Sequence, residues 1–157
     1  MAVGRSNRDY DFLIDAMRNS EYNLRILCDN LHPTKIKNIT IYNNVCNDAY
    51  YEMLSKAYAV IVPLADKNIS SGQLSLIEAM MFGKPIIITK TFGISDYVID
   101  GENCILIENN KEDLAKSIEK ILDSSVYDKL SENGRDMFLQ NYTVAAMAKS
   151  VSKISMR

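Results

Sequence analysis

The chain has 157 residues, 47% of them hydrophobic and 24% charged, with a formal net charge of -2. This length suits one domain with its own core, and the near-balanced charge argues against a nucleic-acid-binding protein that relies on a basic surface. No apolar run reaches the length of a membrane-spanning helix, which excludes an integral membrane segment within this sequence.

Predicted strands and helices alternate along the chain. We expect strands at 1–3, 24–28, 39–42, 59–62, 85–88 and 104–107. We expect helices between them at 9–18, 48–56, 71–82, 95–99 and 112–122, and two further helices at 126–140 and 144–155. The alternation predicts an α/β fold: a Rossmann-like, doubly wound parallel sheet of about six strands with helices on both faces. The first strand is shorter than the five or six residues that are usual in a sheet.

A glycine turn, Gly4-Arg5-Ser6-Asn7-Arg8, follows the first strand. Open α/β sheets place phosphate where such a turn leaves the carboxyl end of a strand and feeds a helix. Arg5 and Arg8 add fixed positive charge and bidentate donors. The alternative is that both arginines are solvated loop cations, paired with nearby aspartates.

The most informative segment runs from Ser70 to Thr89 and comprises a polar loop, an almost wholly apolar helix and a buried strand. Ser70 and Gln73 have the spacing of a capping box, which predicts the start of the helix. Gly83 followed by Lys84-Pro85 predicts its end.

One face of this helix is polar. Ser71, Ser75 and Glu78 share it, while apolar residues cover the rest. Because the helix is too apolar to lie on the surface, Glu78 is expected to point into a cleft that binds a ligand. A solvated carboxylate on an outer helix face is the alternative.

The cysteines and the single histidine do not form a metal site in the sequence. Cys28, Cys46 and Cys104 lack paired spacing and lie in or beside predicted strands, which indicates reduced core thiols and favours the cytoplasm. His32 precedes a proline in a predicted turn and is interpreted as a solvated loop histidine.

Four motifs follow one another between residues 76 and 103 of the chain. They are Leu76-Ile77-Glu78-Ala79-Met80, Gly83-Lys84-Pro85-Ile86-Ile87, Gly93-Ile94-Ser95-Asp96-Tyr97-Val98 and Asp100-Gly101-Glu102-Asn103. Together they resemble the C-terminal domain of GT-B glycosyltransferases, and more narrowly the group-1 (family 4) retaining enzymes. The similarity runs from residue 4 to about residue 142, so the whole chain, 1–157, is interpreted as one donor-binding domain, a single half of a GT-B enzyme.

The resemblance implies roles for individual residues. Arg5 and Arg8 would grip the donor diphosphate and act as the catalytic cations, while Glu78 would accept hydrogen bonds from the ribose. Ser70 stands where the family usually has a first glutamate, which leaves the identity of the sugar open. The full set of donor-binding residues implied is Gly4, Tyr42, Asn43, Val45, Ser70, Ser71, Gly72, Gln73, Leu74 and Glu78.

The function implied is transfer of a sugar from a UDP- or GDP-linked donor, with retention, in polysaccharide or surface glycan biosynthesis. No cofactor or metal is expected, and the nucleotide diphosphate sugar is the substrate. The acceptor would bind a missing N-terminal domain or a separate subunit, and peripheral membrane association would come through that half. Without it, we expect the chain to bind a donor but not to turn it over.

Two alternatives remain open at this point. One is a non-catalytic nucleotide-sugar-binding module or truncated remnant, which the substitution at Ser70 and the short first strand favour. The other is an unrelated doubly wound domain, such as an epimerase half or a receiver-like protein. The motif order between residues 71 and 89 and the lack of paired acids after the first strand disfavour this second alternative.

The last predicted helix carries apolar residues at helical spacing: Val144, Met147, Ala148, Val151 and Ile154. We expect most of this face to pack against the chain's own sheet. The alternative, which the resemblance suggests, is that it contacts the missing half or a second copy of the chain.

Overall fold

The computed structural model describes residues 1–155, and the side chains of residues 1–152. Its strands are β1 (Ala2–Val3), β2 (Leu24–Leu27), β3 (Ile39–Tyr42), β4 (Val60–Val62), β5 (Ile86–Thr89) and β6 (Ile105–Ile107). Its helices are α1 (Tyr10–Met17), α2 (Asn47–Ser55), α3 (Gln73–Met81), α4 (Lys111–Leu122), α5 (Ser124–Asn141) and α6 (Val144–Ser155), with a 3-10 helix η1 (Phe92–Ile94).

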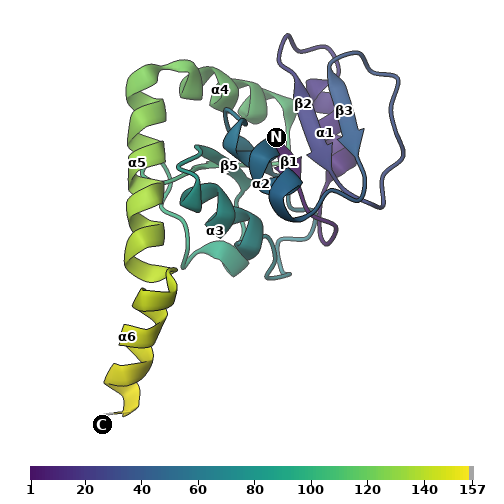
Figure 1. Cartoon of the computed structure of the whole chain (residues 1–157). Helices are drawn as coiled ribbons and strands as arrows, with labels where there is room; N and C mark the ends of the chain where they lie inside the picture. Colours follow the sequence, from purple (N-terminus) through teal and green to yellow (C-terminus); the bar gives the residue numbers. More distant parts are fainter. Residues whose placement is uncertain (156–157) are drawn as a thin grey trace.

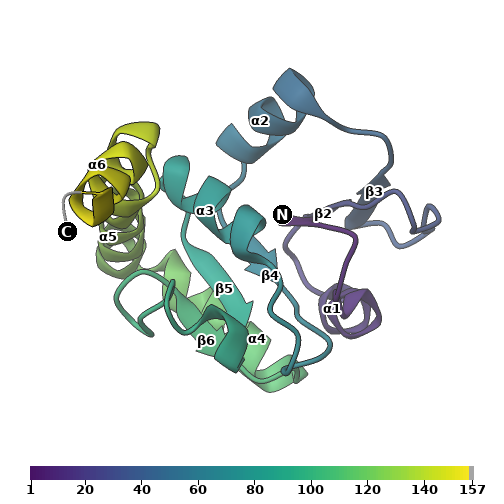
Figure 2. The same cartoon turned by 90° about the horizontal axis from the view of Figure 1, so that it is seen from below.

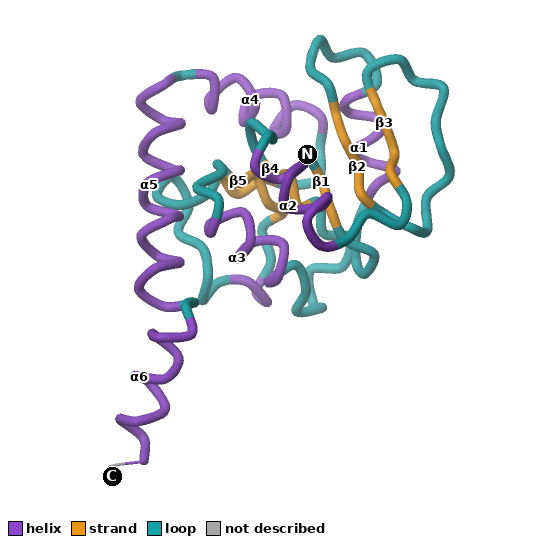
Figure 3. Tube along the Cα trace, viewed as in Figure 1, coloured by secondary structure: helices purple, strands orange, loops and turns teal. Residues whose placement is uncertain are grey.

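All six strands form one parallel sheet in the order β3-β2-β1-β4-β5-β6. Figure 2 shows α1 and α4 on one face of the sheet and α2 and α3 on the other, with α5 along the side. The tube in Figure 3 shows the strands running between these helices. The predicted doubly wound fold is therefore confirmed, and the very short β1 lies between β2 and β4 at the centre of the sheet.

Alternate residues of each central strand supply two separate cores. Ile61 and Ile87 belong to the core shared with α1 and α4, while Val60 and Ile86 belong to the core shared with α2 and α3. Successive side chains of a strand point to opposite faces, so continuous apolar strands are what a sheet covered on both faces requires.

The prediction of a helix at 95–99 is wrong. The structure has only the 3-10 helix η1, followed by turns. The buried Asn103 accepts a hydrogen bond from the Ile99 amide at 2.7 Å and donates to the Tyr97 carbonyl at 3.0 Å. These are backbone groups that a regular helix would use internally, so the side chain of Asn103 fixes a turn instead.

The cysteine prediction holds at two positions of three. Cys28 and Cys104 are buried free thiols, and burial raises the pKa of Cys104 to about 12. Cys46 is exposed, because it is the residue that precedes α2 rather than part of a strand. His32 lies in an exposed loop, as predicted.

The expected packing of α6 against the sheet is also wrong. Figure 1 shows α6 continuing beyond the end of α5, away from the sheet, and α5 is its main neighbour. Val144 and Met147 are exposed, and the predicted apolar position Ile154 lies outside the described side chains. Within residues 1–155, no helix is both long and apolar enough to cross a membrane.

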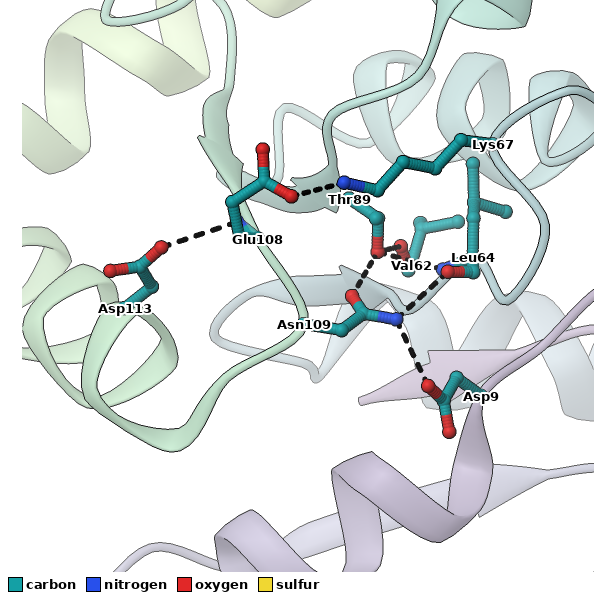
Figure 4. A network of polar contacts seen from close by, with 8 residues as sticks. All are labelled: Asp9, Val62, Leu64, Lys67, Thr89, Glu108, Asn109 and Asp113. Atoms are coloured by element: carbon teal, nitrogen blue, oxygen red, sulfur yellow. Dashed lines mark hydrogen bonds and ion pairs between the residues drawn. The ribbon is translucent and has the colours of Figure 1, made fainter.

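A buried hydrogen-bond network ties the ends of the central strands to the first helix (Figure 4). The Thr89 hydroxyl accepts from the Leu64 amide at 2.8 Å and contacts Asn109 Oδ1 at 2.6 Å. The Asn109 amide nitrogen donates to the Leu64 carbonyl and to Asp9, the residue that caps α1. The network therefore sets where the turn before α1 can lie.

Replacing Thr89 by valine should lower the free energy of unfolding by about 1–3 kcal/mol, because it leaves the buried Leu64 amide without its acceptor. The matched control is Thr40→Val, on the exposed side of β3, which should change stability by less than about 0.5 kcal/mol. Urea unfolding of both variants measures the difference. Equal stabilities would show that the network does not support the fold.

Candidate functional site

A pocket of about 350 Å³ opens at the carboxyl ends of β1, β2 and β3, beside α2 and the start of α3. In open α/β sheets this edge is where ligands bind, next to the point at which strand order reverses. Here the order reverses between β1 and β4. The lining residues are Val3, Gly4, Arg5, Leu27, Cys28, Asp29, Tyr42, Val45, Cys46, Asn47, Tyr50, Tyr51, Leu74, Ser75 and Glu78.

Arg8 fastens the glycine turn to the sheet and to α3. Its guanidinium donates to the Val3 carbonyl at 3.0 Å, the Ser6 carbonyl at 2.8 Å and the Ser75 hydroxyl at 3.1 Å. Gly4, at φ +120°, lies so close that a Cβ there would stand 2.6 Å from Arg8 Nη2. Burial lowers the pKa of Arg8. Arg8 thus lies behind the turn, and it is not among the residues that line the pocket.

Arg5 lies on the wall of the pocket and is held by an aspartate that the sequence analysis missed. Arg5 Nη1 is 3.1 Å from Asp29 Oδ2, and 68% of the Arg5 side chain is exposed. Asp29 Oδ1 also accepts from the Asn44 amide at 2.7 Å. Asp29 lies two residues beyond β2, and its position directly after the strand predicted at 24–28 was the signal that could have identified it.

Ser70 and Gln73 do not form the predicted capping box. Gly72, at φ +90°, precedes α3, and no side chain caps the helix. The Gln73 amide instead donates to the Ser70 hydroxyl and to the Gly93 carbonyl. Gly93 allows this close approach, because a Cβ there would lie 2.7 Å from the Ser70 Cα. The capping box fails because α3 begins at Gln73 itself, whereas the box requires the glutamine at the third position of the helix.

The loop before α3 is joined to the first turn by Asn7. Its amide nitrogen donates to the Ser71 hydroxyl at 2.8 Å and to the Asp66 carbonyl, and its Oδ1 accepts from the Asp66 amide. Asn7 has φ +51°, a conformation that asparagine tolerates better than most residues. Ser71 therefore holds the loop in place, outside the pocket lining.

The turn after β3 supplies one wall of the pocket. Of the three residues predicted to bind the donor there, Tyr42 and Val45 line the pocket, whereas the Asn43 side chain turns inward. Asn43 Nδ2 donates to the carbonyls of Cys28 at 2.7 Å and Leu31 at 3.0 Å, so it fastens two loops together.

Glu78 points into the pocket from α3, as its helical face predicted. Two tyrosines of α2 bind its carboxylate: Tyr50 Oη lies 2.6 Å from Oε2, and Tyr51 Oη lies 3.4 Å from Oε1. Burial and the hydrogen bond to Glu78 both raise the pKa of Tyr50. The sequence analysis missed both tyrosines, because nothing in the local pattern shows that α2 and α3 are neighbours.

The structure thus brings together some of the residues predicted for the site and separates others. The predicted residues that line the pocket are Gly4, Arg5, Tyr42, Val45, Leu74 and Glu78. Those engaged in holding the surrounding loops are Arg8, Asn43, Ser70, Ser71 and Gln73. Gly72 packs against Val62 and Leu64 at the start of α3, at a position where positive φ favours glycine.

A second cavity, of about 390 Å³, lies at the opposite edge of the sheet, where β2 and β4 begin. Its lining is mostly apolar and includes Met17, Leu24, Tyr58 and Ile121. The pocket at the carboxyl edge is different, because it combines a glycine turn, a cation, a carboxylate and aromatic rings. Such a combination suits a ligand with both an anionic group and hydroxyl groups.

The structure is that of a Rossmann-like α/β protein with a pocket at the carboxyl edge of its parallel sheet. Residues 5–137 match the family described as "Glycosyl transferases group 1", and the chain belongs to that family. It is 28% identical over 155 residues to the uncharacterized glycosyltransferase MJ1178 of Methanocaldococcus jannaschii. The aligned region covers 92% of this chain and 43% of that protein. The uncharacterized glycosyltransferase MJ1069 of the same organism is 32% identical over 82 residues, covering 51% of this chain and 21% of its own length. The chain thus spans less than half of each curated relative.

Solved GT-B-like glycosyltransferase structures share the fold. Anabaena Alr3699/HepE in complex with UDP-glucose superposes with a TM-score of 0.77 at 15% identity, over 99% of this chain and 48% of that one. Sucrose-phosphate synthase from Thermosynechococcus elongatus gives a TM-score of 0.76 at 20% identity, over 99% of this chain and 44% of that one. The catalytic domain of the Helicobacter pylori cholesterol-alpha-glucosyltransferase gives a TM-score of 0.66 at 20% identity, over 91% of this chain and 99% of that one.

The two arginines of the turn should differ in what they contribute to stability. Arg8→Met removes three hydrogen bonds from a half-buried guanidinium and should lower the free energy of unfolding by about 1–3 kcal/mol. Arg5→Met removes one exposed ion pair and should cost less than about 1 kcal/mol. Urea denaturation of the two variants tests this difference, and a larger loss for Arg5→Met would contradict it.

Proposed function

We propose that this chain is the donor-binding half of a retaining glycosyltransferase that transfers a hexosyl group from a nucleotide diphosphate sugar. One observation carries the proposal: the glycine turn with Arg5 and the carboxylate of Glu78 line the same pocket at the carboxyl edge. A diphosphate fits beside the turn and the cation, and a ribose diol fits against the carboxylate. The complex of Anabaena Alr3699/HepE with UDP-glucose, on the same fold, supports a donor of this class.

The proposed chemistry places positive charge where the leaving group becomes negative. As the bond between sugar and phosphate breaks, charge grows on the diphosphate, and Arg5 lies on the pocket wall to stabilise it. The start of α3, whose residues Leu74 and Ser75 line the pocket, adds the positive end of a helix dipole. Arg8 contributes its charge from behind the turn. The proposal includes no resident metal or cofactor.

Other parts of the proposal rest on the family resemblance. The acceptor would bind a further domain or a separate subunit, so this chain alone would bind the donor without transferring its sugar. Transfer would proceed with retention, in the synthesis of polysaccharide or another surface glycan. A cytoplasmic location agrees with the buried free thiols of Cys28 and Cys104.

A second candidate is a non-catalytic nucleotide-sugar-binding module. One observation favours it: Ser70, at the position of the family's first glutamate, donates to the Gly93 carbonyl and accepts from Gln73, so a neutral cluster replaces a carboxylate. A transfer assay with a complementing N-terminal half distinguishes the two. Transfer of sugar supports the enzyme, and donor binding without transfer supports the module.

Isothermal titration with UDP, GDP and their glucose conjugates tests the proposal. One nucleotide series should bind saturably, and Glu78→Gln and Arg5→Met should each weaken binding about tenfold, the usual effect of losing one charge-assisted hydrogen bond. Glu132→Gln, an exposed change on α5 outside the pocket, is the control and should leave the affinity unchanged. Absence of saturable binding by the folded chain would overturn the proposal.

Cys46 gives an independent measure of occupancy, because it is exposed and lines the pocket while the other two thiols are buried. One thiol of the native chain should react rapidly with a maleimide, and three should react after denaturation. The nucleotide that binds should slow the fast reaction several-fold, because it covers the Cys46 sulfur. Unchanged kinetics at saturating nucleotide would place the ligand elsewhere.

A further inference from the structure

Both carboxylate oxygens of Glu78 are already hydrogen-bonded, each to a hydroxyl on α2. We propose that these two tyrosines act in opposite directions on donor binding. Tyr50 is a positioning residue that holds the carboxylate in place for the ribose, and Tyr51 occupies the oxygen that the ribose takes. This inference rests on the proposed function, because it assumes that Glu78 receives the hydroxyl groups of a nucleotide.

The two hydrogen bonds are unequal. The bond from Tyr50 to Oε2 measures 2.6 Å, within the range of strong bonds from a hydroxyl to a carboxylate. The bond from Tyr51 to Oε1 measures 3.4 Å, well beyond the usual O–H···O distance. A ligand hydroxyl can therefore replace Tyr51 at little cost, while replacement of Tyr50 would break the better bond.

Tyr50 is held by core packing and by its hydrogen bond to Glu78, as a positioning residue should be. It is partly buried and packs against the core that α2 and α3 share. Its raised pKa keeps the hydroxyl protonated, so it donates to Oε2 and cannot act as a charged group. Holding one oxygen of Glu78 restricts the rotation of a carboxylate that lines the pocket, before any ligand arrives.

Tyr51 has a ring that stays in place and a hydroxyl that is accessible. Its ring stacks on Phe82, with centroids 5.8 Å apart and planes at 20°, and lies 5.1 Å from the Tyr50 ring. The residue is 39% exposed, so its hydroxyl can turn to water once Oε1 is taken. Removing this hydroxyl should leave the ring packing unchanged.

A lysine side chain joins the C-terminal ends of α2 and α3. Lys84, beyond the end of α3, donates from Nζ to the carbonyl of Ser55, the last residue of α2, at 2.7 Å. The tyrosines and Glu78 are therefore presented by two helices that are also joined at their far ends. This arrangement makes the three side chains a preformed unit rather than a chance contact.

The test is isothermal titration of the full chain with UDP and 2′-deoxy-UDP, or with GDP and 2′-deoxy-GDP if GDP is the nucleotide that binds. Tyr50→Phe should weaken binding of the ribonucleotide about fivefold and reduce its advantage over the deoxy form. Tyr51→Phe should tighten ribonucleotide binding about threefold and increase that advantage. A general loss of structure would weaken the binding of both nucleotides by the same factor. The ratio of the two dissociation constants therefore isolates the effect on Glu78.

Tyr58→Phe is the matched control, because Tyr58 donates to the Ile121 carbonyl at the opposite edge of the sheet, away from the pocket. It should leave both affinities unchanged. The roles assigned to the tyrosines are wrong if both tyrosine variants bind like the wild type, or if both affinities shift in the same direction. The proposed function still stands in that case, provided that the wild type binds and Glu78→Gln weakens binding. If the wild type binds no nucleotide, both proposals fail.

Discussion

The structure depends on burying a parallel sheet on both faces. β4 and β5 have buried side chains at every position, and Thr89, the polar residue among them, directs its hydroxyl into a buried hydrogen-bond network. Because both faces are covered, the strands can present polar groups to a ligand only at their ends. The parallel direction then gathers six carboxyl ends along one edge, and the loops at that edge must carry the chemistry.

Stability and site geometry are coupled at the first turn. β1 contributes only Ala2 and Val3, yet it lies between β2 and β4 and leads directly to Gly4. Such a short strand cannot fix the turn by ladder hydrogen bonds alone. Arg8 fixes it instead, by bonding the end of β1 and the first turn of α3, and Asp29 then holds Arg5 on the pocket wall. Arg8 thus has a structural role, whereas Arg5 is exposed and accessible to a ligand.

The fold could be predicted from the sequence because it follows from local signals, namely apolar strands alternating with helices. The predicted orientation of Glu78 came from helical periodicity, and the structure agrees. What could not be predicted depends on contacts between distant segments. Asn103 replaces a helix by a turn, Gly93 draws Gln73 away from the capping position, and Tyr50 reaches Glu78 from another helix. Sequence periodicity carries no information on which side chains meet across such distances.

The pairing of Glu78 with Tyr50 explains how this carboxylate can be kept ready for a ligand. Without such a bond the carboxylate would be free to rotate in the pocket, and a ligand would have to order it on binding. The strong bond from Tyr50 orders it in advance, while the weak bond from Tyr51 satisfies the other oxygen without blocking it. The neutral cluster at Ser70 adds no competing charge. Under the proposed function, recognition of the sugar would then fall to uncharged donors and acceptors around this loop, such as the Ser70 hydroxyl and the Gln73 amide.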